Sequence, residues 1–151
     1  PDIRLVMVGR PGRGYQEVRS AIERAGVGDA LVMHGWLSSE EIVRLLSGAT
    51  ALVFPSLAEG FGLPILDAFQ SSTPVITSRG IATEEVAGGA AILVDPLSVE
   101  EIAEAMRCLA SDNVLRDNLI TRGRARVQEF SWEKTAQKTL DVFQEILEKG
   151  T

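Results

Sequence analysis

Short, uninterrupted runs of apolar residues alternate along the chain with longer segments in which apolar residues recur every three or four positions. The runs cover residues Ile3–Val8, Ala30–Met33, Ala51–Phe54, Pro74–Thr77 and Ala91–Val94. Apolar runs this short, bounded by Gly, Pro or Ser, are typical of strands that are buried on both faces of a parallel sheet. The pattern therefore predicts a set of buried parallel strands.

The segments between the first runs show helical periodicity, as at Val18, Ile22 and Ala25. Beyond Asp95 the strand pattern ends, and three helical segments follow near residues 98–110, 113–128 and 132–148. The predicted order is strand and helix in alternation, with the last two strands consecutive, and then helices. This order predicts an α/β fold, a Rossmann-like doubly wound parallel sheet with helices on both faces and a helical C-terminal extension. Ligands of such sheets bind at the carboxyl ends of the strands.

Several of the predicted helices begin with a recognisable capping residue. Ser38 with Glu41 and Ser98 with Glu101 match the capping-box pattern, in which the serine and the glutamate each satisfy a backbone N–H of the first turn. Ser131 is the expected N-cap of the last helix.

Composition limits the class of protein. A chain of 151 residues with 45% apolar and 24% charged residues is typical of one globular domain, so we expect a single unit over residues 1–151. The net charge of −6 argues against a nucleic-acid surface. No apolar stretch approaches the ~20 residues that a membrane-spanning helix needs. The single cysteine, Cys108, excludes an internal disulfide.

A glycine-rich turn, Gly9 to Gly14, follows the first predicted strand. It does not fit the dinucleotide-binding pattern, because Pro11 occupies the position of the second glycine. Two interpretations stay open, a surface turn or a backbone cradle for phosphate. Arg10 is a candidate for contact with an anionic ligand at this rim.

The stretch from Pro55 to Ala68 carries the most specific chemistry. Glu59 leads into Gly60-Phe61-Gly62, and a helix is expected to begin near Leu63 and Pro64. The N-terminus of a helix offers unpaired N–H groups and the positive end of the helix dipole, which favour phosphate. Asp67 lies one turn into that helix, so two carboxylates flank the helix start and can accept hydrogen bonds from sugar hydroxyls. The alternative is an ordinary loop acid and a solvated helix acid.

The same stretch resembles the signature of the retaining family 4 glycosyltransferases, which have the GT-B fold. That signature is a glutamate, Gly-Phe-Gly-Leu-Pro and a second glutamate eight positions after the first; here Asp67 stands at the second acid. Four further stretches resemble the family in the same order: 34–42, 71–78 with Ser72 in place of the usual glycine, 84–96 and 130–136.

The resemblance implies a donor-binding C-terminal domain and assigns roles to individual residues. Glu59 would contact a hydroxyl of the donor sugar, as the catalytic-site glutamate, and Asp67 would bind the ribose. The loop at Trp36 and Leu37 would flank the base, although packing is the alternative role for Trp36. The remaining contacts, to the sugar and diphosphate, would come from Gly60, Phe61, Gly62 and Leu63. The family's basic residues for the diphosphate lie mainly outside this chain, so Arg10 and Arg79 are the local candidates for that contact. Donor binding in the family needs no metal, so no cofactor is expected beyond the GDP- or UDP-linked substrate.

The implied function is transfer of a hexose of mannose or glucose type to a saccharide or lipid-linked acceptor in polysaccharide biosynthesis. The expected location is the cytoplasm, with the full-length protein peripheral at the inner face of the membrane. Two alternatives stay open: a non-catalytic nucleotide-sugar-binding or regulatory module, and a GT-B epimerase or hydrolase.

The resemblance implies that the given sequence lacks the first strand-helix unit of the family's domain and the N-terminal acceptor domain. The missing strand is central in the usual order, so we expect either a gap or direct pairing of Ile3–Val8 with Ala51–Phe54. Exposed strand edges predict dimerisation or strand exchange. The chain alone is expected to be inactive.

Overall fold

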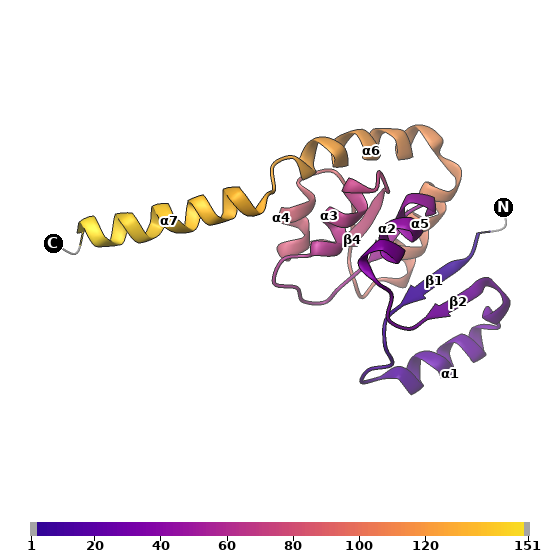
Figure 1. The fold of residues 1–151 in the computed structure, drawn as a ribbon. Helices are drawn as coiled ribbons and strands as arrows, with labels where there is room; N and C mark the ends of the chain where they lie inside the picture. Colours follow the sequence, from indigo (N-terminus) through magenta and orange to yellow (C-terminus); the bar gives the residue numbers. More distant parts are fainter. Residues whose placement is uncertain (1–2, 150–151) are drawn as a thin grey trace. The chain divides into compact units, whose positions relative to one another are not determined.

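The computed structural model describes residues 3–149, which form two compact units. The first ends at Leu45 and the second begins at Leu46. The elements that begin in the first unit are β1 (Leu5–Val8), α1 (Tyr15–Ala25), a 3-10 turn (Gly28–Ala30), β2 (Leu31–His34) and α2 (Ser39–Gly48), which continues into the second unit (Figure 1).

In the first unit β1 and β2 form a parallel pair, in register from Leu5 opposite Leu31 to Val8 opposite His34. No residue between 3 and 45 is buried. The expectation that these two strands are buried on both faces is therefore wrong: Leu5 and Met33 are each 44% exposed. A sheet of two strands gives each strand one hydrogen-bonded neighbour, and α1 contributes no buried side chain to cover it.

The second unit follows a strict alternation of strand and helix and then ends in three helices. Its elements are β3 (Leu52–Phe54), α3 (Leu63–Gln70), β4 (Val75–Ser78), α4 (Ala82–Ala87), β5 (Ile92–Val94), α5 (Val99–Ser111), α6 (Asn113–Val127) and α7 (Trp132–Lys149). The strands form a parallel sheet in the order β3-β4-β5. All four residues of the central strand β4 are buried, which is the two-sided burial that its apolar sequence predicts.

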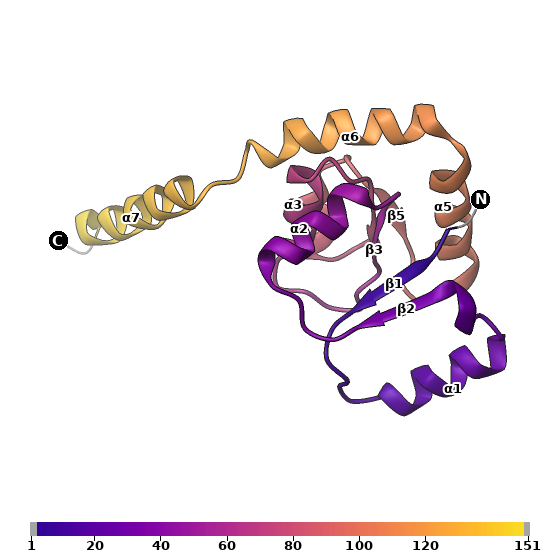
Figure 2. The same ribbon diagram turned by 45° about the vertical axis from the view of Figure 1, so that its right-hand side comes forward.

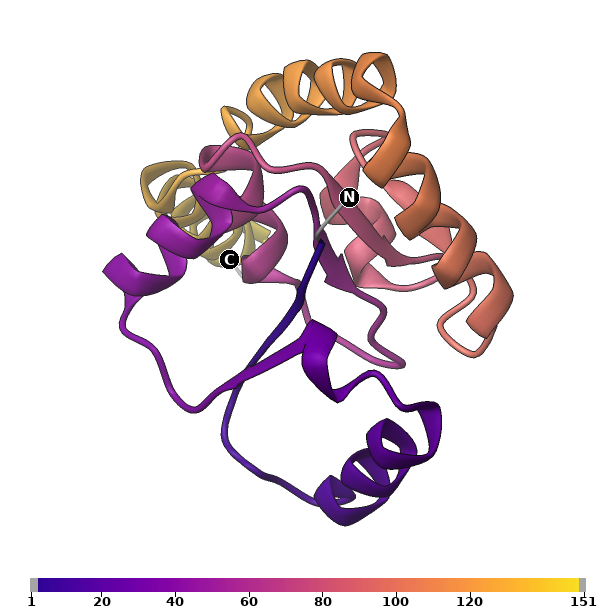
Figure 3. The same ribbon diagram turned by 90° about the vertical axis from the view of Figure 1, so that its right-hand side faces the viewer.

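The core of the second unit lies between this sheet and helices α5 and α6 (Figures 2 and 3). Ile76 of β4 and Val94 of β5 pack with Ala105 and Leu109 of α5 and with Leu119 of α6. Helix α3 buries Ile65, Ala68 and Phe69 and lies beside α6. These contacts fix α3, and with it the loop that precedes α3.

The parallel α/β architecture and all five predicted strands are confirmed, with boundaries shifted by one or two residues. In place of one continuous sheet, the described residues form two, and β1 does not pair with β3, so direct pairing of those strands is wrong. Helix α4 also corrects the prediction, because it lies between β4 and β5, which were expected to follow each other without a helix. This helix has six residues, too few for an apolar periodicity to be visible in the sequence.

Ser72 has a φ of +61°, the only positive φ among the described residues other than glycine. The left-handed conformation explains why glycine suits this position better, since a Cβ there is strained. The Ser72 hydroxyl accepts a hydrogen bond from Nε of Arg124 at 2.7 Å, which partly offsets that strain.

The predicted helix α7 is present, with Ser131 accepting a hydrogen bond from the N–H of Lys134 at 3.1 Å, as an N-cap does. All of its described residues are exposed, including Ala136, Leu140, Phe143 and Leu147, which recur at helical spacing. Over residues 3–149 no helix combines the length and the apolar character needed to span a membrane.

Candidate functional site

The loop from Pro55 to Gly62 connects the carboxyl end of β3 to the start of α3. Within it the Ser56 hydroxyl donates a hydrogen bond to Oε1 of Glu59 at 2.9 Å. The backbone carbonyl of Ser56 in turn accepts a hydrogen bond from the Ser78 hydroxyl, at the end of β4, at 2.5 Å. The exposed Glu59 carboxylate is therefore oriented by a residue that is itself tied to the buried sheet.

Gly62 is the N-cap of α3 and is buried, with a φ of +113° that L side chains rarely adopt. A Cβ at this position would approach Cδ1 of Ile65 to 3.2 Å and Cγ2 of Thr83 to 3.3 Å. The backbone conformation favours glycine, and a Cβ would fit only if Ile65 and Thr83 shifted by a few tenths of an ångström. Pro64 lies in the first turn, where its missing N–H costs nothing, as the sequence predicts.

The backbone around this glycine leaves donors available. The N–H groups of Phe61, Gly62 and Leu63 have no acceptor in the part of the chain that the structure describes. The first hydrogen bond of the helix is that from the N–H of Ile65 to the carbonyl of Gly62, at 2.9 Å. Consecutive free N–H groups at the positive end of a helix dipole favour an anionic group such as phosphate.

Asp67 lies in α3, one turn beyond Leu63, as predicted. Its side chain is exposed by area, yet the protein atoms around the carboxyl raise its pKa above the ordinary value through burial. Among residues 3–149 the carboxylate has neither a hydrogen-bond donor nor an ion-pair partner. A carboxylate without a protein partner beside free N–H groups can accept hydrogen bonds from hydroxyl groups of a ligand.

The other predicted site residues belong to the first unit. Gly9, which precedes Arg10, donates its N–H to the carbonyls of His34 and Gly35, each at 3.2 Å, so the ends of β1 and β2 lie together. Arg10 and Trp36 are exposed there, Trp36 by 69%, while Leu37 is partly buried. The structure thus brings Arg10 near the Trp36 loop within the first unit. In the second unit the loop before α3 carries Glu59, Gly60, Phe61 and Gly62, and the first turns of α3 carry Leu63 and Asp67.

Arg79, a second local candidate for contact with an anion, is already engaged. Its Nη2 donates to the carbonyl of Leu93 at 3.3 Å and to Oε2 of Glu101 at 2.9 Å. The predicted capping box of α5 is therefore only half formed: the N–H of Glu101 donates to the Ser98 hydroxyl, but the Glu101 carboxylate binds Arg79 and the N–H of Asp95. The capping box of α2 is complete, and the N–H of Ser38 lowers the pKa of Glu41.

Sequence reasoning missed the groups that support the loop. Ser78 and Thr83 lie within the second unit's core and carry hydroxyls that bind backbone carbonyls, at Ser56 and Ser78 respectively. Phe130 packs edge-on against Phe61. A hydroxyl residue at the end of a predicted buried strand, such as Ser78, is only a weak sign in the sequence that it supports a site. The contact between Phe61 and Phe130 joins residues so far apart in the sequence that no local pattern predicts it.

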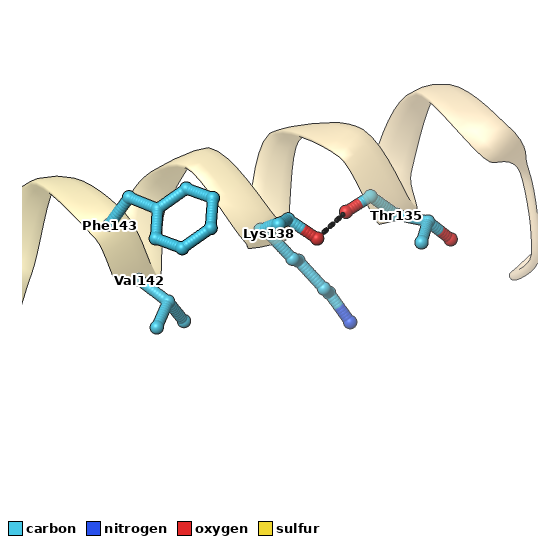
Figure 4. A pocket seen from close by; sticks show the side chains of 5 residues that line it. Thr135, Lys138, Val142 and Phe143 are labelled. Carbon is cyan, nitrogen blue, oxygen red and sulfur yellow. Dashed lines mark hydrogen bonds between the residues drawn. The ribbon is translucent and has the colours of Figure 1, made fainter.

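Two surface hollows among the described residues are lined by residues outside this loop. One is formed on α7 by Thr135, Lys138, Thr139, Val142 and Phe143 (Figure 4). All of these side chains come from a single helix, so the hollow has no opposing wall. The other is formed in the first unit by Ile3, Arg4, Asp29 and Ala30.

The parallel α/β fold, with a glycine-capped helix that follows a strand, is the Rossmann-like type of fold found in GT-B proteins. The chain belongs to the family of glycosyl transferases group 1, whose model matches residues 1–126. The predicted group is thereby confirmed at the level of this family.

Two curated relatives illustrate the similarity. The chain is 38% identical over 131 residues to an MMP alpha-(1->4)-mannosyltransferase of Mycolicibacterium hassiacum, covering 83% of this chain and 32% of that protein. It is 34% identical over 109 residues to O-antigen chain mannosyltransferase B of Escherichia coli, covering 72% of this chain and 29% of that protein. The chain thus spans about a third of the length of the curated relatives that it matches.

Solved structures confirm the fold. Sucrose-phosphate synthase from Thermosynechococcus elongatus matches 97% of this chain and 39% of its own, with a TM-score of 0.83 and 25% identity. Anabaena HepE, in complex with UDP and glucose, matches 96% of this chain and 41% of its own, with a TM-score of 0.85 and 20% identity.

Proposed function

We propose that this chain is the nucleotide-sugar-binding part of a retaining family 4 glycosyltransferase. The full-length enzyme would transfer a hexose of mannose or glucose type from a nucleoside diphosphate to a saccharide or lipid-linked acceptor. The observation that carries the proposal is the segment from the β3–α3 loop into α3, which carries Glu59, three free N–H groups and Asp67 within the residues matched by the family model.

Each group has a distinct role in this proposal. Glu59, held by Ser56, accepts a hydrogen bond from a hydroxyl of the donor sugar. The N–H groups of Phe61, Gly62 and Leu63 bind the sugar and the diphosphate. Asp67 binds the ribose hydroxyls, with a bridging water where its side chain, shorter than glutamate by one methylene, does not reach. In the first unit Arg10 binds phosphate, and Trp36 and Leu37 flank the base.

The chemistry follows from where negative charge develops. Cleavage of the bond between the sugar and the diphosphate leaves charge on the departing phosphate, and the start of α3 stabilises it with N–H groups and the helix dipole. Because donors in place before the reaction need no reorganisation, they favour the transition state over the bound substrate. We propose that the acceptor attacks from the face that the diphosphate leaves, with retention of configuration and without a metal.

Support for a sugar-nucleotide donor comes from the relatives. Two of them are named as mannosyltransferases, and one solved neighbour is a complex with UDP and glucose. The experiment described next identifies the base and the hexose of this chain's own donor.

The proposal is tested by calorimetric titration of the chain with UDP, GDP and ADP and with their common sugar conjugates. We expect saturable binding of one base. Glu59→Ala should weaken binding of the sugar conjugate by about 10-fold or more while leaving the free nucleotide unaffected, because only the sugar contact is lost. Asp67→Ala should weaken the free nucleotide as well.

Asp117→Ala is the matched control, because Asp117 is an exposed acid that belongs to α6 and not to the loop. It should bind as the wild-type chain does. Binding by Glu59→Ala and Asp67→Ala that equals the wild type would contradict the proposed donor site.

A further inference from the structure

The ring of Phe61 contacts a residue far along the chain. Its centroid lies 5.8 Å from that of Phe130, with an angle of 83° between the ring planes. This edge-to-face arrangement is the favoured one for aromatic pairs and stabilises beyond the burial of apolar area. Phe61 lies between the two glycines of the loop, so the pair fixes the most permissive part of the backbone in the site.

Phe130 is in turn held by Arg126. The guanidinium carbon of Arg126 lies 4.8 Å from the centroid of the Phe130 ring, which is within the range of a cation-π interaction. The Arg126 side chain is only 22% exposed and forms an ion pair with Glu129. The ring of Phe130 therefore rests on a side chain that is itself immobilised.

Arg126 is fixed to the body of the second unit through α4. Its Nε donates to the carbonyl of Val86 at 3.1 Å and its Nη2 to the carbonyl of Glu85 at 2.7 Å, near the end of α4. A cation at this end of a helix is favourable. The guanidinium passes so close to Gly88, whose φ is +54°, that a Cβ there would overlap it unless the Arg126 side chain moved.

The same short helix supports the loop from a second position. Cγ2 of Thr83, in α4, would meet a Cβ at Gly62, and the Thr83 hydroxyl donates to the carbonyl of Ser78 at 3.1 Å. Helix α4 therefore bounds Gly62 directly and reaches Phe61 through Arg126 and Phe130. These two residues, which both offer free N–H groups, are held by two separate sets of contacts.

We propose that Phe130, anchored by Arg126, is a positioning residue of the donor site that holds the Gly60–Leu63 backbone in its binding conformation. The inference rests on the proposed function and deepens it: Phe130 touches no ligand and acts through Phe61. Without this contact the two glycines would leave the loop free, and binding a nucleotide sugar would have to include the cost of ordering it.

The first test needs no ligand. Backbone amide order parameters of Gly60, Phe61 and Gly62 are measured by NMR in the free chain and in Phe130→Ala. We expect values of about 0.85 in the wild type and below about 0.6 in the variant. Phe130→Tyr keeps an aromatic ring and should restore order. Phe143→Ala, an exposed phenylalanine on α7, is the matched control and should leave the loop unchanged.

The second test measures binding. Phe130→Ala should weaken the nucleotide sugar found by titration about 3- to 10-fold, and the free nucleoside diphosphate by less, because Glu59 and Phe61 meet the sugar from the same loop. Phe130→Tyr should recover the affinity. A purely structural role would lower the unfolding midpoint of Phe130→Ala without changing this ratio of affinities.

The outcomes separate the two proposals. Unchanged order parameters, or an unchanged ratio of affinities, in Phe130→Ala would overturn the positioning role while Glu59→Ala still tests the donor site. A wild-type chain that binds no nucleotide sugar would refute the proposed function, and the order parameters would then decide alone whether Phe130 holds the loop. Phe130→Leu and Phe61→Leu each keep an apolar side chain but remove the ring. A double variant that binds no worse than either single variant would confirm that the two rings act through each other.

Discussion

At the scale of single residues, the environment of Asp67 opposes its proposed role. Burial of the carboxyl raises its pKa, which means that the surroundings disfavour the ionised form. A ribose contact nevertheless needs oxygens that accept hydrogen bonds, and the ionised form accepts best. A binding group that costs stability in the free protein is typical of functional sites.

The first prediction concerns this conflict. When folding raises the pKa of a carboxyl, the free energy of unfolding is unaffected at a pH below the unfolded pKa of about 3.9. As the pH rises through the folded pKa, the free energy of unfolding falls, because the folded protein disfavours the ionised carboxylate. Asp67→Asn should therefore match the wild-type unfolding midpoint at about pH 3.5 and exceed it at about pH 7. Nucleotide affinity should show the opposite order, with the wild type tighter at neutral pH and losing that advantage as the pH falls.

Thermal unfolding and titration across this pH range check both trends. Asp117→Asn, on the exposed face of α6, should show neither. An Asp67→Asn variant that is less stable than the wild type at neutral pH would show that the Asp67 carboxylate is stabilised by its surroundings, contrary to its raised pKa.

At the scale of elements, the contact between α3 and α6 determines where the site's helix lies. Gly123, in the middle of α6, is buried, and a Cβ there would lie 2.6 Å from Cδ1 of Phe69 on α3. Two helices approach this closely only where one of them lacks a side chain. Glycine in a helix normally costs stability, and here close packing outweighs that cost.

Gly123→Ala should therefore destabilise the chain by about 1–3 kcal/mol, although alanine is the better helix former. Gly48→Ala is the matched control: Gly48 closes α2, and a Cβ there would meet nothing within 4 Å. It should be neutral or slightly stabilising. The midpoint of urea unfolding measures both, and a stabilising Gly123→Ala would contradict the close packing.

Elements were also the scale at which sequence reasoning was most and least successful. The helix α6 is visible in the sequence because Leu115 and Leu119 repeat at helical spacing and both face the core. Helix α4 is not visible, because six residues are too few to repeat an apolar spacing, although Thr83, Val86 and Ala87 are all buried. Its contacts with Arg126 join residues about 40 positions apart, which no local pattern reveals. For the same reason the loop of the candidate site could be found from its motif, but the residues that hold it could not.

At the scale of the whole molecule, burial is concentrated in the second unit. No residue from 3 to 45 is buried, whereas every residue of β4 is. The two sheets also leave one edge of β1 and one edge of β3 without a hydrogen-bonded strand among the described residues. The prediction that such edges lead to dimerisation or strand exchange stays open to sedimentation measurements.

The difference in burial predicts a difference in local stability. Amide hydrogens of β1 and β2 should exchange about 100-fold faster than those of β4, because opening them exposes little apolar area. The partly buried β3 should lie between the two. Hydrogen exchange followed by mass spectrometry measures all of these strands in one sample, and equal protection of β1 and β4 would contradict the prediction.

The support that α4 gives to the loop has a reciprocal consequence. Coupling between two sites is symmetric. If the contacts with α4 strengthen ligand binding by a given free energy, then bound ligand must raise the free energy of opening α4 by that same free energy. A helix of six residues has little stability of its own, which makes it responsive to that contribution. Protection of the α4 amides is thus a second measure of affinity, recorded on a segment that touches no ligand and that the sequence did not reveal.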